Sequence, residues 1–107
     1  MVEEVDPDIP PVRPIIEVIW AAADAWLVDQ IPADKHELMD PGLLAIAEEG
    51  RKLSVTDLVN AHAARVDLGN RMARFHEEYD LLLTPQMPLE AIVAGRNTPD
   101  GLSLIHI

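Results

Sequence analysis

Three consecutive leucines, Leu81–Leu83, constrain the fold of this chain more than any other feature. They stand in the stretch EEYDLLLTPQMP, between a charged helix end and a loop with two prolines. A strand with one face in solvent alternates apolar and polar residues, whereas an uninterrupted apolar run bounded by turn residues is typical of a strand covered on both faces. The run therefore predicts a strand at Leu81–Thr84 inside a parallel or mixed sheet. Only two other segments could pair with it, Val2–Val5 and the last six residues, LSLIHI.

The N-terminal half of the chain predicts a connector and then a helix. Four prolines in Asp6–Pro14 exclude a helix interior and a central strand, because proline fixes φ and lacks an N–H. A helix of about four turns is expected over Ile15–Gln30, where apolar residues recur at intervals of three and four. The stripe that we expect to face the core contains Ile16, Ile19, Trp20, Ala23, Trp26 and Leu27. A loop is expected from Ile31 to Met39.

Two further helices have recognisable ends. Asp40, Pro41 and Gly50 are expected to serve as N-cap, first-turn proline and C-terminal glycine of a short helix. Ser54 and Asp57 form a variant of the capping box at the start of a helix of about 25 residues, roughly 37 Å long. Leu53 and Leu58 occupy the positions of a hydrophobic staple there. The apolar face expected for this long helix contains Leu58, Ala61, Leu68, Met72, Phe75 and Tyr79, with Arg65 interrupting it.

Three helices and at most three short strands make a poor complete domain. Residues that cover Leu81–Leu83 are therefore expected to lie in sequence outside this chain. On this interpretation the chain is a slice of a larger α/β domain, and the isolated polypeptide should be molten or aggregated.

The composition excludes several partners. The 107 residues carry a formal net charge of -11, so phosphate backbones and anionic membranes are repelled and direct nucleic-acid binding is not expected. No run approaches the roughly 20 apolar residues of a membrane span, and Met1–Asp8 is acidic where a signal peptide is basic. Because the chain has no cysteine, it can form neither a disulfide nor a thiolate metal site. We expect a cytoplasmic protein without a cofactor; its oligomeric state stays open.

A search for catalytic groups finds no complete set. Of the two serines, Ser54 has a structural task as an N-cap and Ser103 lies in an uninformative tail. His62 and His76 lie roughly 21 Å apart along a helix and cannot share an ion, and His36 with Asp40 supplies only two ligands. The adjacent acids Glu48–Glu49 and Glu77–Glu78 do not face each other on a helix, which favours solvated surfaces over paired catalytic carboxylates. The sequence therefore predicts neither a catalytic residue nor a metal site in this chain.

The order of the segments resembles the C-terminal half of bacterial amidase signature family enzymes. The similarity covers residues 2 to about 94 and includes VEEVDPDIP, a tryptophan-containing helix, GRKLSVTD and FHEEYDLLLTPQMP. The last of these is the most specific, with Tyr-Asp, an aliphatic strand, Thr-Pro and a second proline. The chain is also similar to the A subunit of aspartyl/glutamyl-tRNA amidotransferase. Residues 1–101 are thus expected to form a partial amidase signature domain, whereas residues 102–107 depart from the family and are expected to be a non-native tail.

The resemblance implies a fold and an activity. The fold class is an α/β fragment, a mainly helical piece with three helices and one or two short strands of a mixed-sheet amidase signature domain. Enzymes of this family hydrolyse or transfer small-molecule amides with a Ser-cis-Ser-Lys triad, in which a serine is activated by an adjacent base. That triad lies N-terminal to the similar region, so Lys35, Lys52, Ser54 and Ser103 inherit no catalytic role and the chain is expected to be inactive alone.

The resemblance also implies pocket residues. Thr84, Gln86 and Met87 fall where the family's chain leaves its strand near the substrate cleft, and they are the candidate pocket residues. A proline-flanked strand exit is an equally good interpretation of the same residues. A different class of function also stays open, in which the chain is a self-standing acidic helical module that docks on a partner groove through the Ile16–Leu27 stripe or the long helix.

Overall fold

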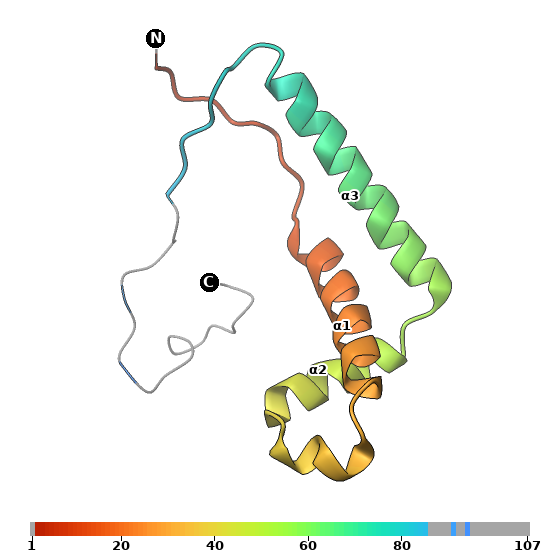
Figure 1. Ribbon diagram of the computed structural model, residues 1–107. Coiled ribbons are helices and arrows are strands. Elements are labelled where there is room, and N and C mark those ends of the chain that lie inside the picture. The colour runs from red at the N-terminus through yellow and green to blue at the C-terminus, as the bar shows by residue number, and fades with distance from the viewer. Residues whose placement is uncertain (1, 86–90, 92–93, 95–107) are drawn as a thin grey trace.

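The chain folds into helices that leave much of their apolar surface uncovered. The structure is a computed structural model, and it describes residues 2–85, 91 and 94. Within that part, the elements in order are α1 (Arg13–Asp29), the 3-10 helix η1 (Ala33–Leu38), α2 (Pro41–Arg51) and α3 (Val55–Phe75). Figure 1 shows α2 beside the C-terminal end of α1, with the longer α3 running back along α1 and away from α2. The mainly helical architecture expected from the sequence is confirmed.

Helix α1 begins two residues earlier than the sequence predicts. Its 17 residues start at Arg13, so that Pro14 lies in the first turn. Proline is tolerated there because the N–H groups of the first turn have no partner within the helix. The cap residue Val12 supplies no side-chain hydrogen bond, and Arg13 instead contacts Glu17 one turn later at 2.7 Å.

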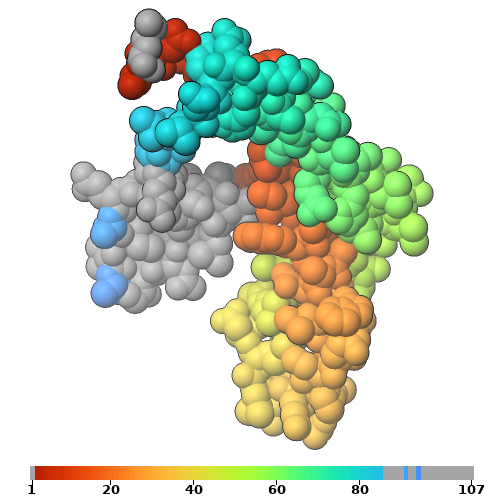
Figure 2. Space-filling view, turned by 45° about the horizontal axis from the view of Figure 1, so that its top comes forward, coloured from red at the N-terminus to blue at the C-terminus, as the bar shows by residue number. Residues whose placement is uncertain are grey.

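The face that α1 buries differs from the predicted one. The buried residues are Ala21, Ala25 and Val28, which lie on the opposite side from the tryptophans. The tryptophan stripe is largely open, with Trp20 62% and Trp26 66% exposed. The prediction of a core-facing tryptophan stripe is therefore wrong within this chain, because alanines allow α2 to approach more closely than tryptophans do. In Figure 2 the atoms of α1 (orange) lie at the surface between α3 and the α2 region.

The segment between α1 and α2 contains more structure than the predicted loop. Residues 33–38 form η1, whose last turn is closed by a bond from the Met39 N–H to the His36 carbonyl. The start of α2 is as predicted: Pro41 occupies the first turn, and the Asp40 carboxylate accepts hydrogen bonds from the N–H groups of Gly42 and Leu43 at 2.7 and 3.2 Å.

Gly50 has a different role from the one expected. It does not end α2, which continues to Arg51 with Lys52 as its C-cap. Gly50 is buried against α1, where a Cβ atom would lie 1.8 Å from the carbonyl oxygen of Ala21 and 2.9 Å from the Cβ of Ala25. The glycine is needed because the backbones of α1 and α2 meet there.

Helix α3 has the predicted start and the predicted face. Ser54 and Asp57 form both bonds of the capping box. Ala61 is buried and the other residues of the expected face are half-buried, whereas Arg65 is exposed. The helix has 21 residues and ends at Phe75, before the acidic pair that the sequence includes in it.

The core is small and lies between α1 and α2. Among the described residues, Val28 is the largest side chain that is fully buried, and it clusters with Ala25 and Ala47. Partly buried Met39, Leu43 and Leu44 pack against this cluster. The predicted strands are absent from the described part: Val2–Val5 and Leu81–Thr84 belong to neither helix nor strand, and the third strand candidate, residues 102–107, lies outside it.

Candidate functional site

The resemblance implies three pocket residues, of which the structure describes one. Thr84 is described and is exposed, in the segment that leaves α3. Gln86 and Met87 lie outside the described residues. Thr84 directly follows Leu83, which lines a groove at the end of α3, but Thr84 itself is not among the residues that line this groove.

The end of α3 forms the floor of this groove. The rings of Phe75 and Tyr79 stack with centroids 4.7 Å apart and an interplanar angle of 21°. His76 donates from Nδ1 to the Tyr79 carbonyl at 2.8 Å, which closes the turn after the helix. The two rings thus lie on one side of the chain as it passes from α3 into the leucine run.

The N-terminal segment forms the other wall. Figures 1 and 2 show the first residues (red) beside the segment that leaves α3 (cyan). The groove holds about 640 Å³ and is lined by Val2–Val5, Phe75 and Glu78–Leu83. A smaller hollow of about 350 Å³ adjoins it and is lined by Val5–Asp8 and by residues of the last α3 turns, including Arg71 and Arg74. The two segments that the sequence predicts as strands are therefore brought together, although they do not pair.

Two polar contacts hold the N-terminal segment against α3. The Tyr79 hydroxyl hydrogen-bonds to the Glu3 carboxylate, and this bond raises the pKa of Tyr79 above its ordinary value. Arg71 contacts Asp8 at 3.5 Å and Asp67 at 3.0 Å, and the pKa of Arg71 is raised, first by the hydrogen bond to Asp67. The pattern of the sequence offers no signal for the Tyr79–Glu3 contact, because nothing in the spacing relates residues so far apart.

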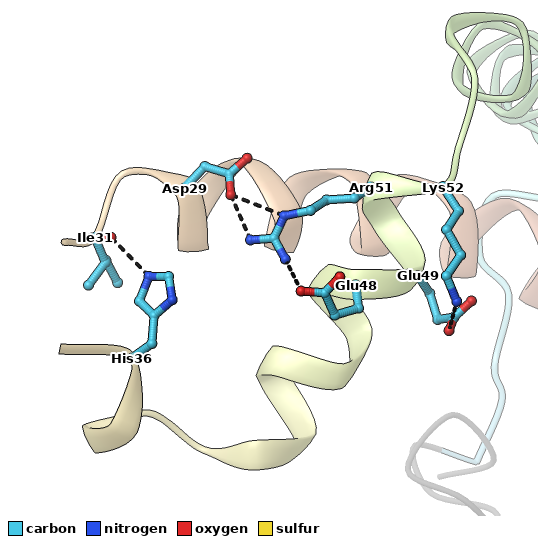
Figure 3. Close-up of polar contacts among 7 residues, drawn as sticks. All are labelled: Asp29, Ile31, His36, Glu48, Glu49, Arg51 and Lys52. Atoms are coloured by element: carbon cyan, nitrogen blue, oxygen red, sulfur yellow. Dashed lines mark hydrogen bonds and ion pairs between the residues drawn. The ribbon is translucent and has the colours of Figure 1, made fainter. Parts of the chain in front are cut away.

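A second polar cluster joins the ends of α1 and α2 (Figure 3). Arg51 donates from Nη2 and Nε to Asp29 at 2.6 and 3.2 Å and also contacts Glu48. Its pKa is raised, most strongly by the hydrogen bond to Asp29. Lys52 pairs with Glu49 at 2.6 Å. These are exposed surface pairs of modest strength, in which Glu48 contacts Arg51 and Glu49 contacts Lys52.

Ser54 is engaged as a cap. Its hydroxyl donates to the Asp57 carboxylate at 2.6 Å and accepts from the Asp57 N–H at 3.1 Å. The hydroxyl, followed by the Ser54 N–H, lowers the pKa of Asp57 below its ordinary value. Both hydrogen-bonding directions of the hydroxyl are used in fixing the start of α3.

The histidines are also engaged in structure or exposed. His36 Nε2 donates to the Ile31 carbonyl at 2.9 Å (Figure 3), while Asp40 caps α2, so this pair is not arranged around a common point. His62 is exposed on α3. In residues 2–85, 91 and 94, no group of three or more His, Cys, Asp or Glu side chains is placed to hold a metal ion.

None of the helices within the described ranges combines the length and the apolar character that crossing a bilayer requires. Comparison of the chain with protein-family models, with curated proteins and with solved structures finds no match.

Proposed function

We propose that this chain is the C-terminal part of an amide hydrolase of the amidase signature family and is inactive alone. The class of enzyme rests on the resemblance of GRKLSVTD and FHEEYDLLLTPQMP to that family. In the fold these two stretches are the entry into α3 and the exit from it. In this proposal the chain supplies covering helices and part of the cleft wall, the remainder of the enzyme supplies the serines and the lysine, and the substrate is a small-molecule amide.

One observation carries the view that the chain is a component of a larger body. Helix α1 is apolar on both sides: Ala21, Ala25 and Val28 pack within the chain, while Trp20 and Trp26 project outward. An exposed apolar patch of this kind typically marks a surface that contacts another body. When a tryptophan becomes covered, a large apolar surface is removed from water, and this stabilises the contact by about 25 cal/mol for each Å² that is buried. The outer face of α1 is therefore suited to pack against a further layer.

Reconstitution tests the proposal. The chain should be expressed alone and joined to the coding sequence upstream of it, and ammonia release from propionamide and benzamide should be measured for both. We expect hydrolysis only from the joined protein. Trp26→Asp should reduce the amount of folded, active joined protein at least ten-fold, because it places a charge in the contact. Leu38→Asp alters another exposed apolar residue and serves as the matched control. A joined protein that folds but hydrolyses neither amide would overturn the proposal.

The same tryptophan face also favours a second candidate function, an acidic helical module that binds a partner. An exposed apolar face that includes tryptophan resembles the anchor surface of a helix that docks in a groove. This alternative predicts that the isolated chain unfolds cooperatively as a monomer and binds a basic partner through Trp20 and Trp26. Cooperative unfolding with no gain of activity in the joined protein would favour it over the hydrolase.

A further inference from the structure

The groove at the end of α3 has two walls whose backbone groups have no partner among the described residues. Val2–Val5 and Leu81–Leu83 both line it, yet no backbone hydrogen bond joins one segment to the other. Nor do the N–H and C=O groups of Leu81–Leu83 bond to any other residue in the described part of the chain. Extended backbone with free donors and acceptors is a template for pairing with another strand.

The side chains of the leucine run are exposed beside this backbone. Leu81 and Leu83 are 80% and 81% exposed, while Leu82 is half-buried. Side chains alternate in an extended segment, so Leu81 and Leu83 share one side and Leu82 takes the other. An added strand would cover the two exposed leucines and remove their apolar surface from water, which favours binding.

The charges around the groove favour a ligand that carries positive charge. Glu3, Glu4, Glu78 and Asp80 line it, and no basic side chain is among its described lining residues. Arg71 and Arg74 line only the adjoining hollow, where Arg71 is held by Asp67 and Asp8. A second copy of this chain, with a net charge of -11, is repelled by these carboxylates. A segment with lysine or arginine is attracted to them.

We propose that this groove binds an extended segment of another polypeptide, with apolar residues on one side and basic residues on the other. The segment pairs its backbone with Leu81–Leu83, places its apolar side chains on Leu81 and Leu83, and directs its cations toward Glu3 and Glu4. The inference goes beyond the hydrolase proposal and is independent of it, because it uses only the backbone and the charges of this chain.

Amide hydrogen exchange of the full chain tests the inference. The probe is a hexapeptide of alternating valine and lysine, acetylated and amidated at its ends, and its counterpart has glutamate in place of lysine. We expect the lysine peptide to slow exchange at Leu81–Leu83 at least ten-fold, and the glutamate peptide to have no effect. Protection at Leu81–Leu83 before any peptide is added, whether constant or rising with protein concentration, would show that the groove is filled by this chain or a second copy and would overturn the inference.

A matched pair of variants separates binding in the groove from general attraction to an acidic protein. Leu83→Asp and Leu38→Asp add the same charge at residues that are both 81% exposed. We expect the Kd for the lysine peptide to rise at least ten-fold in Leu83→Asp and to change less than two-fold in Leu38→Asp. Equal binding by both variants would show that net charge alone attracts the peptide, which contradicts the proposal.

Discussion

The contact between α1 and α2 depends on the absence of a side chain at position 50. Ala21, Ala25 and Gly50 let the two backbones meet, and the core cluster of Ala25, Val28 and Ala47 forms beside them. A larger residue at any of these positions would force the helices apart, because protein interiors are close-packed and yield little to added volume.

Two of the helical glycines, Gly50 and Gly69, allow this to be tested with a matched pair. In Gly50→Ala the added methyl group meets the Ala21 backbone, whereas in Gly69→Ala it meets no atom within 4 Å. We expect Gly50→Ala to weaken the α1–α2 contact by about 1–3 kcal/mol. Gly69→Ala should stabilise α3 by about 0.5–1 kcal/mol, since alanine restricts the unfolded chain more than glycine does. Helix content from circular dichroism and exchange rates of the α2 amides measure both effects, and equal behaviour of the two variants would contradict the close approach at Gly50.

The capping box makes the start of α3 sensitive to acid. The folded-state pKa of Asp57 lies below its ordinary value of 3.8 because Ser54 donates two hydrogen bonds to the carboxylate. A lowered pKa contributes stability that is complete above the unfolded value and is lost as the pH falls through the folded value. We expect α3 to lose helix content below about pH 3.8, with a smaller loss in Asp57→Asn. Circular dichroism from pH 6 to pH 2 measures this loss. As a control, Asp24→Asn alters an acid outside the cap, and its helix content should fall over the same pH range as that of the parent chain.

Ser54→Ala removes the same cap without removing a charge. It should cost about 1 kcal/mol, a factor of about five in the local helix equilibrium. The loss should be concentrated in the exchange of the first α3 amides. Uniform loss along the helix would mean that the cap does not act locally.

At the scale of elements, the two apolar sides of α1 explain what sequence patterns could and could not predict. Ser54 and Asp57 encode the start of α3 locally, so this start could be predicted from the sequence. The inner face of α3 could also be predicted, because its apolar residues continue at helical intervals to Phe75 and Tyr79. On α1 either face satisfies a helical period, so the intervals of three and four residues that predict the tryptophan stripe do not distinguish it from the alanine face. The alanine face was chosen by close approach to Gly50, which depends on residues distant in the sequence and leaves no periodic signal.

A pair of neighbouring substitutions on α1 tests which face is inside. Ala25 is buried and Trp26 is exposed. Ala25→Glu should break the α1–α2 contact, because it places an unpaired carboxylate beside Gly50 at a cost of about 3 kcal/mol or more. Trp26→Glu should change the free energy of unfolding of the isolated chain by no more than about 0.5 kcal/mol, and its helix content should stay close to that of the parent. Circular dichroism and amide exchange measure both effects. A larger loss of stability in Trp26→Glu than in Ala25→Glu would show that the tryptophans lie in the core.

At the scale of the whole molecule, the small core limits cooperativity. Among the described residues the buried apolar side chains are alanines and one valine, while two tryptophans and two leucines of the Leu81–Leu83 run stay exposed. We expect the isolated chain to melt over a broad temperature range, to bind the dye ANS and to show a urea m value below about 1 kcal/mol/M. A steep two-state transition would contradict the interpretation of the chain as a component of a larger body.

The candidate site shows the same limit of local patterns at larger scale. The sequence offered Val2–Val5 as a possible neighbour of a strand at Leu81–Thr84 and favoured neighbours outside this chain, and the fold brings the two segments to one groove without pairing them. Pairing depends on tertiary neighbours, which no local pattern specifies. The bond from Tyr79 to Glu3 that joins these walls is equally beyond the reach of spacing rules.

The tight meeting of Ala21, Ala25 and Gly50 has a consequence for how the polypeptide is made. Ala21 and Gly50 are 29 positions apart, and the entropy cost of closing a loop grows only slowly with its length. Both helices also precede α3 in the chain. Helices α1 and α2 can therefore dock during synthesis, before α3 has emerged from the ribosome. Trp20 and Trp26 are then exposed on the docked pair and can contact a neighbouring folded segment.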